Sequence, residues 1–148
     1  MLGAVPRFMM DISLRVVCAA CLAGSPMQRA CVTDIRALAW RPASCDLVYS
    51  PSTLDHFLHG RDIPVALSEL GAVLRPGGRL LLTLDNPSNP LVRARNALWQ
   101  LVGPVNPLIP FPMGRTLSRA ALVNVLERVG FEVLRSGYVV HAPRTVTC

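Results

Sequence analysis

The chain of 148 residues contains no lysine, and all 15 of its basic residues are arginines. The arginines are dispersed, no run of five basic residues occurs, and aromatic residues make up only 5% of the chain. Nucleic-acid-binding surfaces usually gather basic residues on one face and add aromatic rings on which bases stack. Despite the net charge of +6, we therefore expect no nucleic-acid partner.

Long apolar runs and an even set of cysteines are also missing. No apolar run approaches the ~20 residues that a membrane-spanning helix needs, so the sequence predicts no membrane span. The five cysteines are an odd number without the spacing of a disulfide framework, which fits free thiols in a reducing compartment and a cytoplasmic location. Cys18 and Cys21 have the spacing of half a zinc site, but no second pair follows suitably, so no metal site is predicted.

The motifs of several enzyme classes are absent. The sequence has no Gly-x-Ser-x-Gly nucleophile elbow, no Walker loop for phosphates and no His-Glu-x-x-His metal motif. Half of the residues are nevertheless apolar, so the chain can bury a core, and its length predicts a single domain over residues 1–148.

The centre of the chain has the pattern of a strand, a helix and a second strand. Leu47–Tyr49 is a short β-prone run, and apolar residues then recur at helical spacing from Ala66 to Leu74. We expect Asp62 to cap this helix and Arg75–Gly78 to end it in a tight turn. Arg79–Leu84 is a continuous apolar run, which is typical of a parallel strand covered on both faces.

Further elements are expected on both sides of this unit. Before it, the pattern predicts a strand over Val5–Met10, a buried helix over Leu14–Ala23 and a short strand that ends at Thr33 or Asp34. After it, Leu117–Val129 is predicted to be a helix that Ser118 caps and Gly130 ends, followed by a late strand over Phe131–Val140.

Residues 90–116 are predicted to be a Pro-rich insertion. Leu91 to Leu101 has the spacing of a helix, but prolines at 104, 107, 110 and 112 exclude a regular helix from 103 to 114. An apolar loop beside a strand exit often closes over a substrate, so this segment is a candidate lid. A surface linker and an amphipathic segment on a membrane surface are the alternatives.

Two motifs in the central unit point to a family. The first is Cys45-Asp46-Leu47-Val48, then Ser50, then Leu54-Asp55-His56-Phe57; the second is Glu69-Leu70-x-x-Val73-Leu74-Arg75-Pro76-Gly77-Gly78-Arg79-Leu80. The chain thereby resembles the class I S-adenosylmethionine-dependent methyltransferases of the type 11-like, small-molecule kind, from about Met10 to Val140 and most strongly from Asp34 to Asn86. The resemblance implies a Rossmann-like fold, a mostly parallel sheet flanked by helices, and methyl transfer from S-adenosylmethionine to a small-molecule acceptor.

The resemblance also implies which residues hold the cofactor. Asp11 and Ile12 match the end of the family's second strand, where a carboxylate can accept both ribose hydroxyls. Asp34 and Ile35 match the position where a carboxylate meets the adenine amino group and a backbone N–H meets a ring nitrogen. The alternatives are that Asp11 caps a helix and that Asp34 forms an ion pair with Arg36 in a turn.

Other polar residues follow the central strands. The resemblance places Ser50 and Ser52 at the edge of the cofactor, and Asp85 and Asn86 opposite the methyl acceptor. Asp55 and His56 are the candidate catalytic residues, with His56 as a general base. The alternative is that His56 hydrogen-bonds Asp55 and shapes the loop.

The sequence departs from the family before Asp11. The family has a first strand and a Gly-rich loop there, whereas no Gly-x-Gly precedes Asp11 and Gly3 stands alone. We therefore expect an incomplete Rossmann-like sheet without its first strand and helix, in which Val5–Met10 either pairs with Leu47–Tyr49 or leaves an edge unpaired. We also expect that this chain alone binds S-adenosylmethionine weakly, and that an exposed sheet edge favours self-association.

Two other functions remain open on the sequence. A nicotinamide-dependent oxidoreductase also places an acidic residue after a strand, although the Arg75–Gly78 turn argues against this class. A non-catalytic remnant or interaction module would use the exposed sheet edge and bind no ligand.

Overall fold

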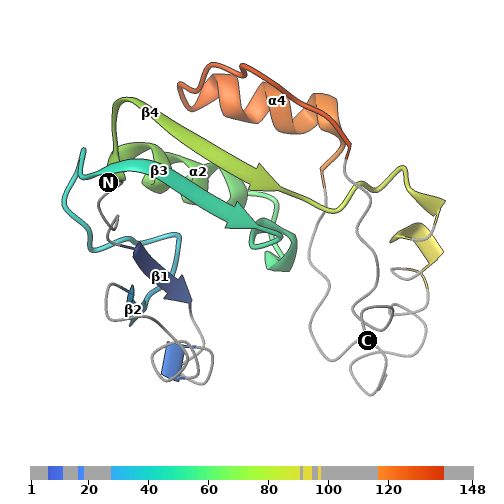
Figure 1. Cartoon of the computed structure of the whole chain (residues 1–148). Coiled ribbons are helices and arrows are strands. Elements are labelled where there is room, and N and C mark those ends of the chain that lie inside the picture. The colour runs from blue at the N-terminus through green and yellow to red at the C-terminus, as the bar shows by residue number, and fades with distance from the viewer. Residues whose placement is uncertain are drawn as a thin grey trace, which may run out of the picture.

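The computed structural model describes residues 7–11, 17–18, 28–90, 92–94, 97 and 117–138. The elements in chain order are β1 (Arg7–Asp11), β2 (Gln28–Val32), β3 (Cys45–Pro51), the 3-10 helix η1 (Leu54–His56), α2 (Asp62–Val73), β4 (Leu74–Thr83) and α4 (Arg119–Arg128) (Figure 1). Strands that alternate with helices give an α/β fold, as the sequence predicts.

The described strands form two parallel pairs. β1 pairs with β2 from Arg7 opposite Gln28 to Asp11 opposite Val32, and β3 pairs with β4 as far as Pro51 opposite Thr83. Figure 1 shows the arrowheads of β1, β3 and β4 pointing to the same side, so their carboxyl ends lie at one edge of the fold. Among the described residues no ladder joins β1 to β3.

Helix α2 begins at Asp62, but Asp62 does not cap it. The N-cap position belongs to Arg61, which makes no side-chain capping bond. The Asp62 carboxylate instead accepts a hydrogen bond from Nη1 of Arg36 at 3.1 Å. The predicted cap is therefore wrong, because a guanidinium far away in the sequence engages the side chain. Pro64 lies in the first helical turn, where its missing N–H costs no helical bond.

The turn before β3 completes the other end of α2. The N–H groups of Ala43 and Ser44 donate to the carbonyls of Ala72 and Val73, each at 2.9 Å. Carbonyls in the last turn of a helix have no partner within the helix, so these bonds satisfy two of them.

The predicted tight turn over Arg75–Gly78 is a bulge inside β4. The ladder steps from Cys45 opposite Leu74 to Leu47 opposite Arg79. An advance of two positions along β3 therefore corresponds to an advance of five positions along β4. Gly77 has a φ of +76°, a conformation that glycine adopts without steric cost. The chain thus enters the strand directly after the helix, and the surplus residues bulge out rather than form a separate loop.

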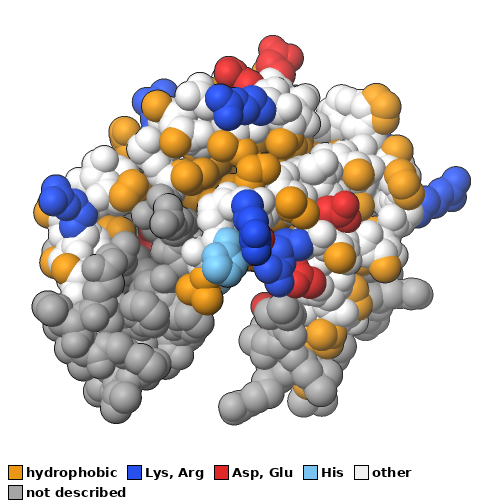
Figure 2. Space-filling model, turned by 180° about the vertical axis from the view of Figure 1, so that it is seen from behind, with side chains coloured by type: hydrophobic (Ala, Val, Ile, Leu, Met, Phe, Trp, Pro, Cys, Tyr) orange, Lys and Arg blue, Asp and Glu red, His pale blue; other side chains and the backbone are white. Residues whose placement is uncertain are grey.

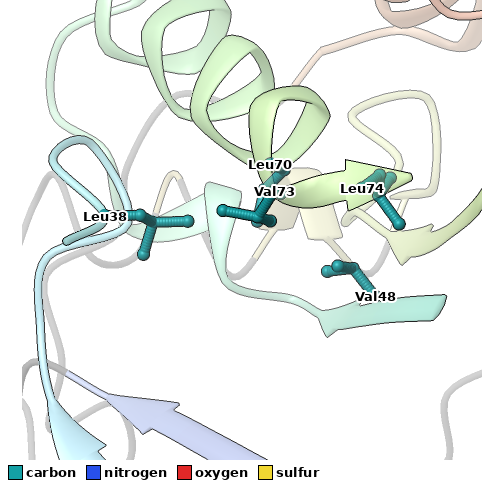
Figure 3. Close-up of a cluster of buried hydrophobic side chains, with 5 residues drawn as sticks. All are labelled: Leu38, Val48, Leu70, Val73 and Leu74. Carbon is teal, nitrogen blue, oxygen red and sulfur yellow. The ribbon is translucent and has the colours of Figure 1, made fainter. Parts of the chain in front are cut away.

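Helix α2 covers one face of the β3–β4 pair. Its buried residues recur at the spacing that the sequence predicts, and the largest of them are less than 2% exposed. One cluster joins α2 to the strands and to the loop after β2, and it consists of Leu38, Val48, Leu70, Val73 and Leu74 (Figure 3). A second cluster joins α2 to η1 and α4, and it consists of Leu54, Ile63, Ala66, Leu67 and Leu126.

The opposite face of the β3–β4 pair is exposed. Leu47 and Tyr49 are each 60% exposed and Leu81 is 57% exposed. Leu80 and Leu82, the neighbours of Leu81, instead pack against the buried clusters. The prediction that β4 is covered on both faces is therefore wrong, because the described helices that pack on it lie on the Leu80 side only.

Helix α4 begins as predicted. The Ser118 hydroxyl accepts a hydrogen bond from the N–H of Ala121 at 3.3 Å. Beyond the helix, Gly130 has a φ of +95° and the N–H of Phe131 donates to the carbonyl of Leu126 at 2.9 Å. This is a helix ending in which glycine takes the left-handed position.

The predicted late strand is not formed over residues 131–138. No described strand pairs with this segment, and a strand without a partner leaves its backbone groups unbonded. The segment lies along α4 instead: Nε of Arg119 donates to the Ser136 hydroxyl at 2.9 Å, and its guanidinium lies 5.9 Å from the centre of the Tyr138 ring.

Two predictions fall mainly outside the described residues. In the expected helix at 14–23, the structure describes only residues 17–18, which are helical. In the predicted insertion at 90–116, it describes residues 90, 92–94 and 97, which are also helical. The candidate lid at 103–114 lies outside the described part, so it stays a prediction. Across the described residues, no helix combines the length and the apolarity that crossing a membrane requires.

Candidate functional site

Polar residues gather where the parallel strands end. Backbone bonds tie the neighbouring ends together: the N–H of Thr33 donates to the carbonyl of Asp11, and the N–H of Ser52 donates to the carbonyl of Thr83, each at 3.0 Å. We call this side of the fold the exit edge, and it comprises Asp11, Asp34, Ser50, Ser52, Asp55 and Asp85. Open α/β sheets bind ligands outside the carboxyl ends of their strands, so the exit edge is the candidate site.

The first two candidate residues lie at the end of β1. Asp11 is the last residue of the strand, opposite Val32, and it is half-buried. Its ribose role stays a prediction. Ile12 lies outside the described residues.

Asp34 follows β2 and is engaged by Arg36. Nη2 and Nε of Arg36 donate to the Asp34 carboxylate at 2.6 and 3.0 Å, and the Arg36 backbone N–H adds a bond of 2.8 Å. The hydrogen bonds from the Arg36 side chain and backbone lower the pKa of the Asp34 carboxyl. The ion pair named as an alternative from the sequence is thus present. Ile35 beside it packs against both buried clusters.

The Arg36 side chain also contacts two distant segments. Its Nη1 donates to the Asp62 carboxylate at the start of α2 at 3.1 Å. Its guanidinium lies 5.5 Å from the centre of the Phe57 ring, which is a cation–π distance. Together with the bonds to Asp34, these two contacts join the loop after β2, the segment after η1 and the first turn of α2.

Two serines at the end of β3 occupy unusual positions. Ser50 is 4% exposed, and its hydroxyl has no hydrogen-bond partner among the described residues. Ser52 has a φ of +48°, a left-handed conformation that costs a non-glycine residue on the order of 1 kcal/mol or more. Buried unpaired polar atoms and backbone strain both concentrate at functional sites.

Asp55 and Asp85 are brought together by folding. Asp55 is 4% exposed, and both of its carboxylate oxygens accept the backbone N–H of Asp85 at 3.1 Å. The neighbouring Asn86 accepts the N–H of Ser88 through its side-chain oxygen at 3.0 Å. Asp55 therefore fixes the backbone of the predicted acceptor-facing segment.

His56 follows Asp55 and its side chain is exposed. Shortly after it, His59 and Arg61 line an open hollow on the surface together with Leu58 and Gly60. Figure 2 shows a histidine side chain next to basic side chains, with acidic side chains nearby. No group of three or more His, Cys, Asp or Glu that could hold a metal occurs in the described part of the chain.

The sequence does not reveal the full role of Arg36 or of Glu69. The spacing of Asp34 and Arg36 suggests their ion pair, but nothing in the pattern links Arg36 to Asp62. The Glu69 carboxylate accepts the N–H of Leu38 at 2.9 Å, and this bond joins α2 to the loop after β2. Contacts across 26 and 31 residues leave no local signal in a single sequence.

The comparisons with known proteins agree with this geometry. The family model for the methyltransferase domain matches residues 8–82, which are 75 of the 148 residues. No curated protein matches the chain.

Solved structures share the fold. An S-adenosylmethionine-dependent methyltransferase from Methanosarcina mazei has a TM-score of 0.66 and 18% identity, with 84% of this chain and 68% of that chain covered. A second such enzyme, from Thermotoga maritima, has a TM-score of 0.70 and 19% identity, and the match covers 85% of this chain and 55% of that chain. A third, from Mesorhizobium loti, has a TM-score of 0.61 and 19% identity, and the match covers 83% of this chain and 62% of that chain. The chain thus spans between about half and two thirds of the length of these structures.

The family match includes the two motifs that carry the resemblance and every exit-edge residue except Asp85. The structural likeness shows a Rossmann-like arrangement and confirms the predicted fold class. The chain therefore belongs to the methyltransferase-domain family.

Proposed function

We propose that the exit edge binds S-adenosylmethionine and that the domain transfers its methyl group to a small-molecule acceptor. Family membership and the S-adenosylmethionine-dependent enzymes among the structural neighbours imply this cofactor. The observation that carries the proposal is the buried Ser50 hydroxyl, which has no partner among the described residues. An unpaired buried hydroxyl is unfavourable by about 1–3 kcal/mol, so a ligand that supplies a partner stabilises this site.

The other cofactor residues fit this assignment in different ways. Asp11 ends the strand beside β2, where its carboxylate would bind ribose hydroxyls. Asp34 accepts three N–H groups of Arg36, and the Nε–H group bonds both carboxylate oxygens, so the adenine amino group would share an oxygen with one of these donors. Ser52 lies at the edge of the cofactor in this proposal.

The remaining residues would serve the acceptor. When bound, the cofactor supplies a methyl group on a positively charged sulfur. His56, with an exposed imidazole, would take the proton from the acceptor. Asp55 would act mainly by holding the Asp85 backbone, so that Asp85 and Asn86 face the acceptor in a fixed orientation.

A titration of the chain with S-adenosylmethionine by calorimetry tests the proposal. The titration extends to millimolar cofactor because the sequence predicts weak binding, and a nicotinamide dinucleotide serves as the ligand of the alternative enzyme class. Saturable binding of S-adenosylmethionine, without binding of the nicotinamide dinucleotide, supports the proposal. Absence of any binding up to several millimolar contradicts it and favours the non-catalytic alternative.

The Ser50→Ala variant tests whether the Ser50 hydroxyl contacts the cofactor or has only a structural role. If Ser50 contacts the cofactor, the variant weakens binding by about 2- to 10-fold while the free energy of unfolding stays equal or rises, since a buried unpaired hydroxyl is removed. If Ser50 is only structural, binding is unchanged. Ser68→Ala, which alters an exposed serine on α2, is the matched control.

A further inference from the structure

We propose that Arg36 is a positioning residue that joins the end of β2 to the start of α2 and thereby sets the affinity of the exit edge for the adenine end of the cofactor. This inference rests on the proposed function. We call Asp34, Arg36 and Asp62 together the Arg36 clamp. Its role goes beyond the ion pair of Asp34 and Arg36, because it links segments that lie 26 residues apart.

The geometry of the clamp favours a defined orientation of Asp34. The Nε and Nη2 atoms of Arg36 form a planar fork on the carboxylate, at 3.0 and 2.6 Å. Such bidentate pairs fix both partners more strictly than a single bond does. Because the Arg36 backbone N–H bonds the same carboxylate at 2.8 Å, the side chain of Asp34 is held from two directions.

The outer part of the clamp connects this loop to the helix. The Asp62 side chain is only 16% exposed and accepts from Nη1 of Arg36 at 3.1 Å. The Phe57 ring packs against the same guanidinium, 5.5 Å from its central carbon. Since α2 is anchored in both buried clusters, it offers Arg36 a rigid support.

A second bond runs parallel to the clamp. Glu69, two turns further along α2, accepts the N–H of Leu38 at 2.9 Å. The loop after β2 is thus attached to α2 at two nearby points, through the Arg36 side chain and the Leu38 backbone. Removing Arg36 would free only the point nearer to Asp34, which lies at the exit edge.

The charges explain why the clamp depends on arginine. One guanidinium faces two carboxylates, and without it Asp34 and Asp62 would repel each other across the same space. A lysine would restore the charge but not the fork. We therefore expect Arg36→Lys to keep the fold and to lose the orientation of Asp34.

The first arm of the test uses the protein without cofactor. Amide hydrogen exchange by mass spectrometry would compare Arg36→Met and Arg36→Lys with the wild type. We expect faster exchange in two separate segments, residues 34–37 and 57–62, in Arg36→Met. Arg75→Met, which breaks an exposed ion pair with Asp46, is the matched control and should leave both segments unchanged. Faster exchange at 34–37 alone would overturn the proposed link to α2.

The second arm measures the affinity for S-adenosylmethionine by calorimetry. We expect about 3- to 10-fold weaker binding in Arg36→Met and Arg36→Lys, with a smaller loss in Asp62→Asn. In turnover assays, the KM for the cofactor should rise while kcat stays within about 2-fold, because Arg36 lies away from the transferred methyl group in this proposal.

The outcomes separate the two proposals. A wild type that does not bind S-adenosylmethionine contradicts the proposed function, and with it the role of Arg36 toward adenine, whereas the exchange data still decide whether the clamp couples the two segments. A wild type that binds, with unchanged affinity in both Arg36 variants, contradicts this inference alone. If Arg36→Met does not fold, Arg36→Lys keeps the charge balance and supplies the decisive comparison.

Discussion

The carboxylate of Asp55 accepts the backbone N–H of Asp85 with both oxygens, each at 3.1 Å. The two residues are 30 positions apart, one in η1 after β3 and the other just after β4. Asp55 is buried, so the bond lies in an environment where an unmatched polar group is unfavourable. It determines the direction in which the chain leaves β4.

Asp55→Ala should lower the free energy of unfolding by about 1–3 kcal/mol, because the Asp85 N–H loses an acceptor inside the protein. Asp55→Asn should cost less, since its amide oxygen can still accept the bond. Urea unfolding measures both values.

The control for Asp55 is Asp46→Asn. Asp46 pairs with Arg75 at 2.6 Å, but its side chain is 78% exposed, and such pairs contribute about 0–1 kcal/mol. Equal losses in Asp55→Ala and Asp46→Asn would contradict the structural role of Asp55.

Leu70→Ala should destabilise the protein by about 2–5 kcal/mol, because Leu70 is 1% exposed in the cluster under the sheet. Leu81→Ala removes the same atoms from an exposed face and should cost less than about 1 kcal/mol. Chemical unfolding compares the two. A large loss in Leu81→Ala would mean that a further surface covers β4 in solution.

The Asp34 carboxyl should titrate below its ordinary value of about 3.9. Its pKa is lowered in the folded protein by the Arg36 hydrogen bonds, so the ion pair adds stability above the unfolded-state pKa. That contribution is lost as the pH falls through the lowered folded-state value. NMR of the carboxyl carbon measures this titration.

Arg36→Met should move the Asp34 titration up toward its ordinary value. Asp34→Asn should remove this part of the acid dependence of stability, so its unfolding free energy falls less steeply below about pH 4 than that of the wild type. An Asp34 titration that does not respond to Arg36→Met would contradict the assignment of the cause.

His56→Ala should reduce kcat for methyl transfer by about 10²- to 10⁴-fold with little change in cofactor affinity, if His56 is the general base. A panel of phenols, amines and carboxylates supplies the acceptor for the assay. His59→Ala, three residues on and also exposed, is the control. Unchanged turnover in His56→Ala would leave His56 with a role in loop shape only.

Local patterns in the sequence predict the local structure well. The buried residues of α2 follow the helical spacing, and Ser118 caps α4, because period and capping depend on residues only a few positions apart. The resemblance in the central motifs likewise predicts the family and the fold. These features require no knowledge of distant partners.

The incorrect predictions share one cause: they depend on contacts with distant parts of the chain, which the pattern of a single sequence does not show. Asp62 would serve as a cap by its position, but Arg36 engages it from 26 residues away. The apolar run of β4 suggests cover on both faces, yet whether Leu81 is covered depends on which elements pack on the sheet. The roles of the exit-edge residues stay predictions for the same reason, since they depend on a ligand.

The bulge in β4 bears on how this domain can vary in length. Side chains along a strand alternate between faces, so a one-residue insertion in a continuous ladder would turn Leu80 and Leu82 outward. The surplus residues between Leu74 and Arg79 are not held in register with β3, so a residue gained or lost there can be taken up before the regular pairing resumes. Relatives should therefore tolerate insertions and deletions at residues 75–78 far better than at 79–83.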